Sequence, residues 1–418
     1  MLKVLVVGKG GREHALLTAM NRSPTAAELY SFPGSDAIFS DGVRAAPGVH
    51  DLPTLMQFVI REKMDLVVAG EESYLVTGEG LANLCTQAGI PCWGPPKESA
   101  QLEASKEFAK SFLRRHGIPT ARYTVAGTIE EAEVAAAEVP IVLKFDGLAA
   151  GKGVAVCHSP EEVSKFLQAV FVKGSFGRGR VVIEECMTGP EISIFASVVD
   201  GKYQILCPAR DYKRVYDGDR GPNTGGMGAV ASPELVSQSV LEQIEREVIQ
   251  PTMAGLLKDT LSYRGFLYFG LMLTPEGPKV VEYNCRFGDP ECEAVMPLLT
   301  GDLVRYMLEG AQGRLCPELI SFQKGWSVCK ILASAGYPIS SHRGDLITGL
   351  EDVREAQVFH CGTTHRAGGY LTSGGRVLAV VAQAASRAQA VEAVEREARK
   401  ISFAGQHSRS DIGRLHFD

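Results

Sequence analysis

Short apolar runs alternate with amphipathic stretches over the first hundred residues of the chain. The pattern predicts strands at 2–8, 27–32, 64–70 and 89–94, with a helix from about Glu13. Such alternation is typical of a parallel sheet with helices on its faces. Ligands in these sheets bind at the carboxyl ends of the strands, so the loops after the runs are candidate binding sites.

A second alternating pattern lies between residues 105 and 187. Ser105 is a typical N-cap for a helix over 105–120, and Thr128 with Glu131 matches a capping box for a helix over 128–139. The other elements predicted here are a strand at 141–145, a helix at 159–171 and a strand at 180–187. We expect these elements to form a compact β-α-β unit around the glycine-rich segment between the first two strands.

Longer apolar runs follow, and they predict strands at 192–200 and 266–273 with a helix near 233–258. From about Gly325 the pattern changes again. It predicts strands at 326–336, 358–363 and 376–383 and a helix from Ser386 to Ile401. We expect a separate last domain there.

Composition narrows the class of protein. The chain has 418 residues, 45% hydrophobic and 22% charged, with 43 Lys and Arg against 49 Asp and Glu and a net charge of −6. This balance does not favour a nucleic-acid binder, which usually carries a basic surplus. No apolar run is long enough to span a bilayer, and the start of the chain is typical of a buried strand rather than a signal peptide. The ten cysteines form no C-x-x-C pair, which fits a reducing cytoplasm, so we expect a cytoplasmic location. From the charge balance and the short apolar runs we expect no nucleic-acid or membrane partner.

Glycines follow the first strand in a pattern close to a dinucleotide fingerprint. Glu13 stands where the third glycine is required, and the second strand ends at Pro33 and Gly34 without the acid that binds ribose. NAD binding is therefore not favoured. The helix N-terminus after Gly8–Gly11 can still bind a phosphate group, although a tight turn explains some of these glycines equally well.

The segment Gly147–Gly153 combines three glycines, two alanines and Lys152 between two strands. It is not a P-loop, because Asp146 stands where the first glycine would be and Gly153 replaces the Ser or Thr after the lysine. Its backbone N–H groups and one cation can nevertheless approach phosphates closely. Lys144, on the preceding apolar strand, favours an anion nearby, although a solvated lysine at a hairpin is the alternative.

Polar residues alternate along the segment 279–291. On a strand, Glu282, Asn284 and Arg286 share one face, and Val281, Tyr283 and Cys285 share the other. A carboxylate and an amide oxygen two residues apart suit Mg²⁺, and the arginine can stabilise a phosphoryl group in transfer. The alternative is an amphipathic strand with one wet face.

Two further segments carry charge in unusual density. The stretch 211–229 mixes Lys213, Arg214 and several acids with glycines, which favours a polar ligand over a merely flexible loop.

The strand at 180–187 ends in Glu184–Met187, and Glu191 follows shortly after it. This fits a hinge whose backbone pairs with an adenine edge and whose acid holds a ribose hydroxyl, or simply a charged turn.

Taken in order, these motifs resemble the ATP-grasp superfamily and, within it, the phosphoribosylamine–glycine ligase family. The resemblance is carried by VLVVGKGGREHAL, LEASKEFAKSFL, KFDGLAAGKGV, VVIEECMTGPEIS, GPNTGGMGA and EYNCRFGDPE. It implies an α/β fold, α+β overall, with ATP bound between two ATP-grasp domains. The implied parts are a Rossmann-like N-terminal domain at 1–103, a central ATP-grasp domain at 104–120 plus 191–325, a lid at 121–190 and a mixed C-terminal domain at 326–418.

The same resemblance implies roles for individual residues. ATP would be bound by Lys106, Lys144, Gly151, Lys152, Gly153, Glu184, Glu185, Cys186, Met187, Glu191, Arg214 and Asn223. Glu282 and Asn284 would bind Mg²⁺ or Mn²⁺, and the catalytic Arg286 and Asp211 would face glycine or its acyl phosphate. Phosphoribosylamine would be held by Gly10, Gly11, Arg12, Glu13, His14, Glu72, Gly225, Gly226 and Met227. The expected protein is a monomer with glycine and 5-phosphoribosylamine as substrates.

The chain departs from the family pattern at a few positions, and the departures keep two alternatives open. The segment Glu71–Tyr74 lacks the usual prolines, which is compatible with a different ATP-grasp carboxylate–amine ligase. Glu293 stands where glutamine is usual, and Leu415 where the family has arginine. These two positions motivate the second alternative, a non-catalytic nucleotide-binding regulator.

Overall fold

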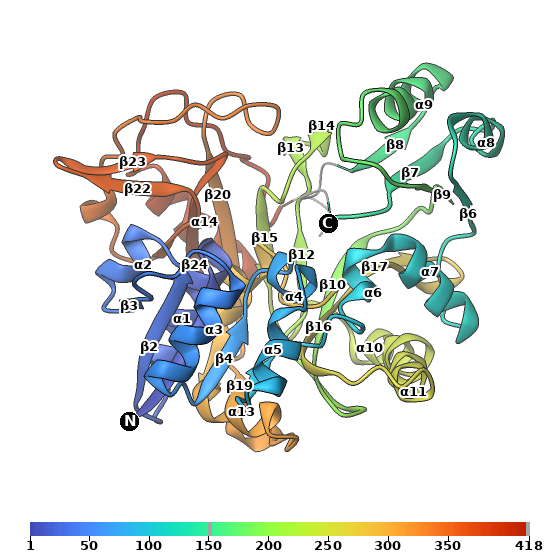
Figure 1. The fold of residues 1–418 in the computed structure, drawn as a ribbon. Coiled ribbons are helices and arrows are strands. Elements are labelled where there is room, and N and C mark those ends of the chain that lie inside the picture. The colour runs from blue at the N-terminus through green and yellow to red at the C-terminus, as the bar shows by residue number, and fades with distance from the viewer. Residues whose placement is uncertain (149–152, 415–418) are drawn as a thin grey trace.

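The computed structural model describes residues 1–148 and 153–414. Its first part is a five-stranded sheet in the order β3-β2-β1-β4-β5, with every pairing parallel. The strands are β1 (Leu2–Gly8), β2 (Ala27–Pro33), β3 (Arg44–Ala45), β4 (Leu66–Ala69) and β5 (Cys92–Trp93). The predicted parallel sheet is therefore confirmed, with β3 as a short addition at its edge (Figure 1).

Helices cover the faces of this sheet. They are α1 (Gly11–Asn21), α2 (Asp36–Ser40), α3 (Leu52–Glu62), α4 (Ser73–Val76) and α5 (Leu81–Gln87). Helix α1 begins at Gly11, earlier than predicted, because the Glu13 side chain turns back and its Oε2 accepts from the N–H of Gly10 at 2.7 Å. The carboxyl ends of β1 and β4 meet, since the N–H of Gly70 donates to the carbonyl of Val7 at 2.9 Å.

The next part is a four-stranded antiparallel sheet in the order β6-β9-β7-β8, which we call the lid sheet. Short α6 (Gln101–Ala104) and α7 (Lys106–Arg115) lead into it, and Ser105 caps α7 as predicted. Its elements are β6 (Tyr123–Ala126), α8 (Ile129–Ala135), β7 (Ile141–Phe145), β8 (Val154–Cys157), α9 (Pro160–Leu167), the π-helix η1 (Gln168–Val172) and β9 (Val181–Glu185). Helix α8 stops short of the predicted end at Val139. Thr128 caps it, but the Glu131 carboxylate accepts from the N–H of Gly127 rather than from that of Thr128, so the predicted capping box is incomplete.

The largest sheet follows the path β17-β16-β10-β12-β15-β20-β24-β21, with β11 paired to β10. Its strands are β10 (Glu191–Val199), β11 (Lys202–Ile205), β12 (Ala209–Asp211), β15 (Gly228–Ala231), β16 (Arg264–Thr274), β17 (Gly277–Asn284), β20 (Trp326–Ala333), β21 (Gln357–His360) and β24 (Arg376–Ala384). Because β15 pairs directly with β20, the sheet runs without a break across the predicted boundary at 325/326.

Three two-stranded ribbons and the remaining helices complete the described chain (Figure 1). The ribbons are β13 (Arg214–Tyr216) with β14 (Arg220–Asn223), β18 (Leu299–Gly301) with β19 (Ile320–Phe322), and β22 (Thr363–Arg366) with β23 (Gly369–Thr372). The helices are α10 (Gln238–Ile244), η2 (Glu245–Ile249), α11 (Gln250–Lys258), α12 (Glu291–Val295), η3 (Met296–Leu298), α13 (Leu303–Ala311), η4 (Pro317–Leu319), η5 (Leu350–Asp352) and α14 (Arg387–Ala398). Over the described residues, none of the helices has the length and apolar character needed to cross a membrane.

Candidate active site

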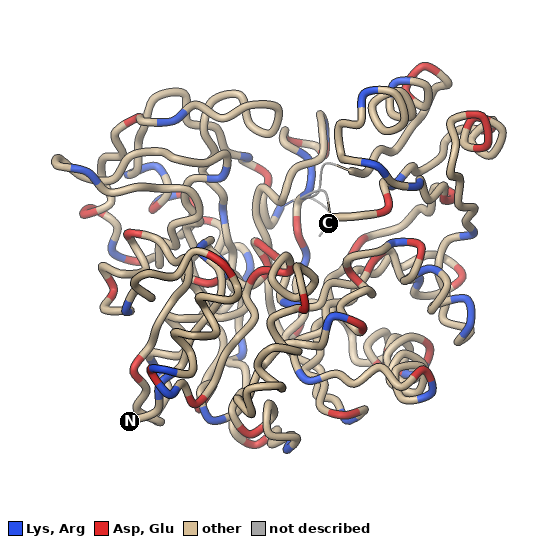
Figure 2. The backbone as a smooth tube through the Cα atoms, viewed as in Figure 1, with Lys and Arg blue, Asp and Glu red and all other residues tan. Residues whose placement is uncertain are grey.

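A cleft of about 1190 Å³ is lined by residues from the N-terminal loops, the lid sheet and the largest sheet. Figure 2 shows acidic and basic residues interspersed along the chain, including the middle of the molecule where these parts approach one another. The cleft brings together most of the residues that the sequence singled out for binding. Those in its lining are Gly10, Gly11, Arg12, Glu13, Glu72, Lys106, Lys144, Gly153, Glu184, Glu185, Cys186, Met187, Glu191, Asp211, Arg214, Asn223, Gly225, Glu282, Asn284 and Arg286.

Two lysines share one carboxylate on the lid side of the cleft. Lys144 Nζ lies 2.8 Å from Glu184 Oε1, and Lys110 Nζ lies 2.9 Å from Glu184 Oε2. Burial opposes the ionisation of Glu184, but the two ammonium groups outweigh it and lower the pKa of the carboxyl. Burial also lowers the pKa of Lys110 to about 8, against the attraction of Glu184. The group carries one surplus positive charge when both lysines are protonated, which suits a bound phosphate.

Lys106 and Lys144 both reach backbone carbonyls at the edges of the cleft. Lys106 Nζ donates to the carbonyl of Gly147 at 2.9 Å, and Lys144 Nζ donates to that of Val281 at 3.0 Å. The Asp146 carboxylate accepts from the N–H of Glu107 at 3.1 Å, so the lid supplies a cap for helix α7. These contacts fix two cations beside the segment that the sequence predicted to cover phosphates.

The segment after β9 forms another wall of the cleft. The Glu185 side chain points away to Arg122, 2.6 Å from its Nε, so this residue presents its backbone rather than its acid. Glu191 pairs with Lys213 at 2.5 Å, and this ammonium group lowers the pKa of the carboxyl. Arg214 and Asn223 face each other across the β13–β14 ribbon. These residues therefore lie together along one wall of the cleft, with Lys213 as an additional cation.

Glu282 and Asn284 lie on β17 and both line the cleft. A β-bulge interrupts the β16–β17 pairing at this point, because Gly270 pairs with Glu282 while Leu271 pairs with Val280. Val281 is therefore extra in the ladder and also lines the cleft, contrary to the simple alternation expected from the sequence. Tyr283 and Cys285 are both buried, although Tyr283 also contributes to the lining of the cleft.

Carboxylates crowd the floor of the cleft around one lysine. Burial raises the pKa of Asp211 to about 8, Lys213 opposes this shift, and the nearby Glu291, Glu191 and Glu282 add to it. Glu291 is buried and accepts from the Ser193 hydroxyl at 2.9 Å. A carboxylate and an amide oxygen in such a field suit a hard divalent cation. Within the described ranges no cluster of three or more His, Cys, Asp or Glu side chains could hold a metal by itself, so the remaining ligands would come from substrate or water.

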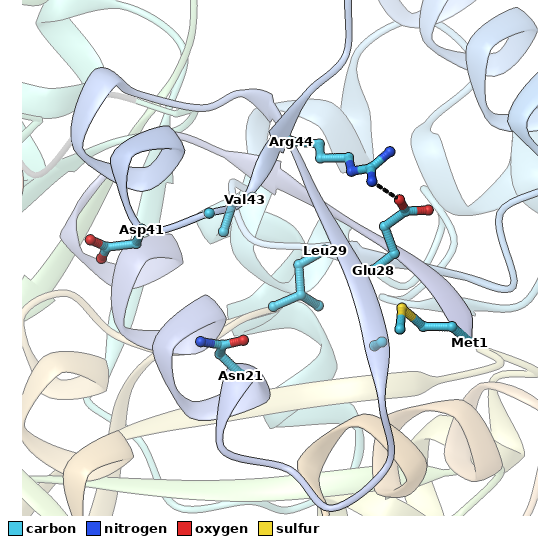
Figure 3. Close-up of a pocket in the computed structure, with 9 residues that line it drawn as sticks. Met1, Asn21, Glu28, Leu29, Asp41, Val43 and Arg44 are labelled. Carbon is cyan, nitrogen blue, oxygen red and sulfur yellow. Dashed lines mark ion pairs between the residues drawn. The ribbon is translucent and has the colours of Figure 1, made fainter.

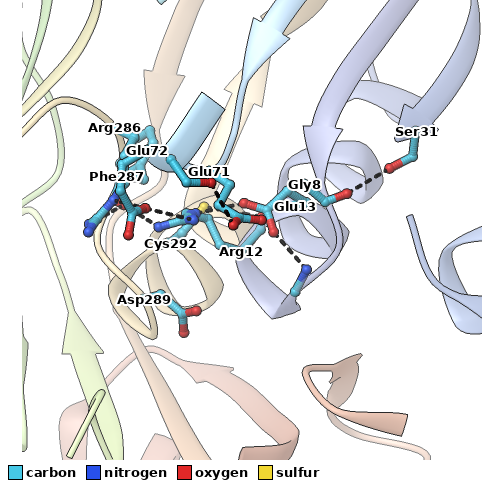
Figure 4. A network of polar contacts seen from close by, with 12 residues as sticks. Gly8, Arg12, Glu13, Ser31, Glu71, Glu72, Arg286, Phe287, Asp289 and Cys292 are labelled. Carbon is cyan, nitrogen blue, oxygen red and sulfur yellow. Dashed lines mark hydrogen bonds and ion pairs between the residues drawn. The ribbon is translucent and has the colours of Figure 1, made fainter. Parts of the chain in front are cut away.

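Arg286 and Glu72 belong to a partly buried network that joins the end of β17 to the N-terminal loops (Figure 4). Arg286 Nε lies 3.1 Å and Arg12 Nη2 lies 3.6 Å from Glu72 Oε2. Burial opposes the ionisation of Glu72, but the two guanidinium groups lower the pKa of its carboxyl to about 2. The Arg12 side chain also reaches Glu13 Oε1 at 2.7 Å, so Glu13 holds the loop and its neighbour in place.

The glycine at the start of α1 is required by its neighbours. A Cβ on Gly11 would come within 2.4 Å of Glu293 Oε1 and 2.6 Å of Cys361 Sγ. Glu293 is fully buried, and among the described residues neither of its carboxylate oxygens has a hydrogen-bond partner. Burial and the adjacent Asp289 raise the pKa of this carboxyl well above its usual range. The position that differs from the family pattern therefore lies directly behind the wall of the cleft.

Three residues predicted to bind substrate are not in the lining of the cleft: His14, Gly226 and Met227. His14 Nε2 lies 2.7 Å from Asp41 Oδ2, and its Nδ1 accepts from the N–H of His360 at 3.1 Å, so both ring nitrogens are engaged elsewhere. Met227 is fully buried, and Gly226 packs against Pro290 with a φ of 109°. Gly151 and Lys152 lie outside the described residues.

Other residues of the cleft received no role from the sequence: Glu103, Lys110, Asp289 and Arg376. Arg376 pairs with Asp289 through Nη1 at 2.8 Å, and the same group donates to the carbonyl of Gly225 at 2.6 Å. The sequence could have predicted Lys110 as a cleft residue, because it follows Lys106 by one helical turn and so lies on the same helix face. It could not have predicted Arg376, because the residues that Arg376 contacts are 87 and 151 positions away.

A smaller pocket of about 220 Å³ lies at the outer edge of the N-terminal sheet (Figure 3). Its lining includes Asn21, Asp41 and an ion pair between Arg44 and Glu28 at 2.5 Å. These charged groups already have partners, and none of the residues predicted to bind a ligand lines it. The large cleft remains the candidate active site.

The parallel N-terminal sheet, the antiparallel lid and the cleft between them define the ATP-grasp fold. Biotin carboxylase from Campylobacter jejuni shares this fold, with a TM-score of 0.73 and 16% identity over 98% of this chain and 94% of that one. Models of the phosphoribosylglycinamide synthetase N domain, ATP-grasp (A) domain and C domain match residues 2–103, 104–292 and 327–415.

Individual relatives agree with these family models. A phosphoribosylamine–glycine ligase from Caulobacter vibrioides is 44% identical over 99% of this chain and 98% of its own length. The crystal structure of a phosphoribosylamine–glycine ligase from Thermotoga maritima has a TM-score of 0.85 and 35% identity, covering 98% of this chain and 100% of that one. The chain belongs to the phosphoribosylglycinamide synthetase family, which confirms the resemblance seen in its sequence.

Proposed function

We propose that this protein joins glycine to 5-phosphoribosylamine at the expense of ATP, giving glycinamide ribonucleotide, ADP and phosphate in purine biosynthesis. The observation that supports the proposal is the composition of the large cleft. Several lysines, Glu282, Asn284 and Arg286 line this one cavity, in a chain that is similar to ligases over 98–99% of its length.

The reaction needs two displacements. An oxygen of the glycine carboxylate attacks the γ-phosphorus of ATP, the bond to ADP breaks, and glycyl phosphate forms. The amine nitrogen of phosphoribosylamine then attacks the glycyl carbon; the C–N bond forms, the bond from that carbon to the phosphate oxygen breaks, and the nitrogen loses a proton. No protein nucleophile is required, so the protein contributes positioning and charge neutralisation.

The nucleotide end of the cleft supplies cations and a polar wall. Lys106 and Lys144 would contact the phosphates, together with Gly153. The backbone of Glu184–Met187 would pair with adenine, and Glu191 would hold a ribose hydroxyl with Arg214 and Asn223 nearby. Lys144 is held by Glu184 and the Val281 carbonyl, contacts that would orient it toward the phosphates.

Glu282 and Asn284 would hold Mg²⁺ or Mn²⁺, and the cation would neutralise charge on the transferring phosphoryl group. Arg286 is fixed by Glu72 and would bind the glycine carboxylate or its phosphate, with Asp211 close to the same point. Gly10–Glu13, Glu72 and Gly225 would bind phosphoribosylamine. For His14, Gly226 and Met227 we now propose support of this surface rather than direct contact.

We also propose that the protein acts as a monomer in the cytoplasm, without nucleic-acid or membrane partners, and that its domains divide near residues 103, 120, 190 and 325. The closing of a lid over the cleft would keep water from glycyl phosphate.

The direct test is the release of phosphate from ATP with Mg²⁺. We expect release only when glycine and phosphoribosylamine are both present. Release with a different acid or amine in a screen would instead identify another carboxylate–amine ligase, a possibility that the altered Glu71–Tyr74 segment motivates. Tight ATP binding without turnover of any substrate pair would identify a nucleotide-binding regulator.

A further inference from the structure

Glu103, at the end of α6, receives three hydrogen-bond donors from consecutive residues of one strand end. Its Oε2 accepts from the backbone N–H of Cys285 at 2.6 Å. Its Oε1 lies 2.6 Å from Arg286 Nη2. The Asn284 amide is assigned the orientation in which its nitrogen and oxygen both have suitable hydrogen-bond partners, and its nitrogen then lies 3.0 Å from the same Oε1. The Glu103 side chain is 7% exposed and lines the cleft.

These contacts determine which way Asn284 points. Its amide nitrogen donates to Glu103 and to the carbonyl of Tyr283 at 3.1 Å, which leaves the amide oxygen free of both. A metal ion can bind only the oxygen of an amide side chain. The acceptor at Glu103 therefore selects the orientation in which Asn284 can serve as a ligand.

We propose that Glu103 is a positioning residue that presents the Asn284 oxygen to the divalent cation and holds Arg286 at the same time. The proposal rests on the assignment of Asn284 as a metal ligand under the proposed function. It couples the cation site to the side chain that would bind the glycine carboxylate, because one carboxylate orients both. Partners of this kind change metal affinity by 10- to 100-fold in other proteins, roughly the effect expected here.

Only a carboxylate can satisfy this arrangement, because all three neighbours are donors. A glutamine at this position would turn its NH₂ group either toward Cys285 N–H or toward Asn284 and Arg286. Glu103→Gln is therefore nearly isosteric but loses one side of the contact. Glu72→Gln is the matched comparison, since Glu72 also pairs with Arg286 at 3.1 Å but has no hydrogen bond to Asn284.

The experiment measures Mn²⁺ binding to the full chain with saturating ADP, by electron paramagnetic resonance of free Mn²⁺. We expect Glu103→Gln to weaken Mn²⁺ binding by about 10-fold or more and Glu72→Gln to change it less than about 2-fold. In an Asn284→Ala background, Glu103→Gln should have little further effect, because its action runs through the amide. An equal loss in both glutamate variants, or wild-type binding in Glu103→Gln, would overturn the proposal.

A folding defect is checked separately. If Glu103→Gln does not fold, Glu103→Asp keeps the charge but withdraws the carboxylate from Asn284, and wild-type Mn²⁺ binding in that variant would refute the proposal. The measurement needs neither glycine nor phosphoribosylamine, so it can succeed even if the substrate assignment fails. If the wild-type chain with ADP bound no Mn²⁺, the cation site and this proposal would fall together.

Discussion

Lys144 Nζ lies 2.8 Å from Glu184 Oε1, and the two side chains are only 6% and 2% exposed. Lys110 approaches the other oxygen of the same carboxylate at 2.9 Å and is equally buried. One acid therefore balances two buried ammonium groups on different elements, α7 and β7. The arrangement holds the lid sheet against the helix that carries Lys106, and it keeps Lys144 in position for a phosphate.

Removal of this acid should destabilise the protein. Glu184→Gln removes the charged carboxylate that pairs directly with two buried lysines, and we expect a loss of about 3–5 kcal/mol in the free energy of unfolding. The neighbouring Glu185 carboxylate accepts from the backbone N–H and the Nε of Arg122, whose side chain is 90% exposed. Glu185→Gln keeps an acceptor oxygen but loses the ion pair, and it should cost less than about 1 kcal/mol. Chemical denaturation of both variants measures the difference, and equal effects would contradict the role assigned to Glu184.

Loss of the proposed metal ligand should abolish turnover without unfolding the chain. We expect Glu282→Ala to lower kcat roughly 10³-fold, because loss of the cation would remove several kcal/mol of transition-state stabilisation. Glu276→Ala is the control on the same hairpin, because that side chain is 77% exposed and pairs only with Lys279 among the contacts of the described chain. Steady-state phosphate release at saturating ATP and Mg²⁺ gives the comparison; wild-type kcat in Glu282→Ala would exclude the metal assignment.

An added methyl group at Gly11 should disturb the proposed binding surface for phosphoribosylamine. Its Cβ would meet the buried Glu293 carboxylate at 2.4 Å, and overpacking of this kind costs about 1–3 kcal/mol. Gly127→Ala is the control, since its Cβ would meet nothing closer than 3.7 Å. We expect a lower melting temperature and a raised KM for phosphoribosylamine only in Gly11→Ala, with the KM for ATP little changed. An equal KM in both variants would argue against a role for this loop in binding.

His360 should make the stability of the fold depend on pH. Burial, together with the neighbouring His14, lowers the pKa of His360 to about 4 from an ordinary 6.5, while Asp41 opposes the shift. The unfolded chain then binds a proton between pH 6.5 and 4 that the folded chain does not. This contribution to stability is complete above pH 6.5 and is lost as the pH falls, by up to about 3 kcal/mol.

Denaturation of the wild type and of His360→Gln between pH 4 and 7 measures this term. The variant should show a shallower fall in stability with falling pH over that interval. A parallel fall in both proteins would assign the pH dependence to other groups.

The sequence predicted the parts of the fold that depend on local pattern. The parallel N-terminal sheet follows from alternating apolar runs, and the cap at Ser105 from a local side-chain contact that the structure confirms. The continuity of the largest sheet through β15 and β20 could not be predicted, because residues far apart in the sequence pair there, from Ala231 with Ser327 to Gly228 with Lys330. The bulge at Val281 could not be predicted either, because the expected alternation of side chains along a strand assumes regular pairing with its neighbour.

In the candidate active site too, the sequence predicted the residues that lie in local motifs but not the contacts between residues distant in the chain. Residues inside glycine-rich or charged motifs, such as Lys144 and Glu282, were predicted to bind ligands and do line the cleft. His14 sits in such a motif, but its orientation depends on Asp41 and His360, which only the tertiary structure brings near. Glu103 lies in the LEASKEFAKSFL motif, but the motif indicated no role for it, and its importance comes from three donors more than 180 residues away.

The central claim is that the cleft activates a carboxylate by phosphorylating it. Glycine labelled with ¹⁸O in both carboxylate oxygens, incubated with ATP, Mg²⁺ and phosphoribosylamine, tests this claim most directly. Mass spectrometry of the released phosphate should find one ¹⁸O atom in each molecule, carried over when the bond between the glycyl carbon and the phosphate oxygen breaks. Phosphate free of ¹⁸O, formed together with the amide product, would contradict the account.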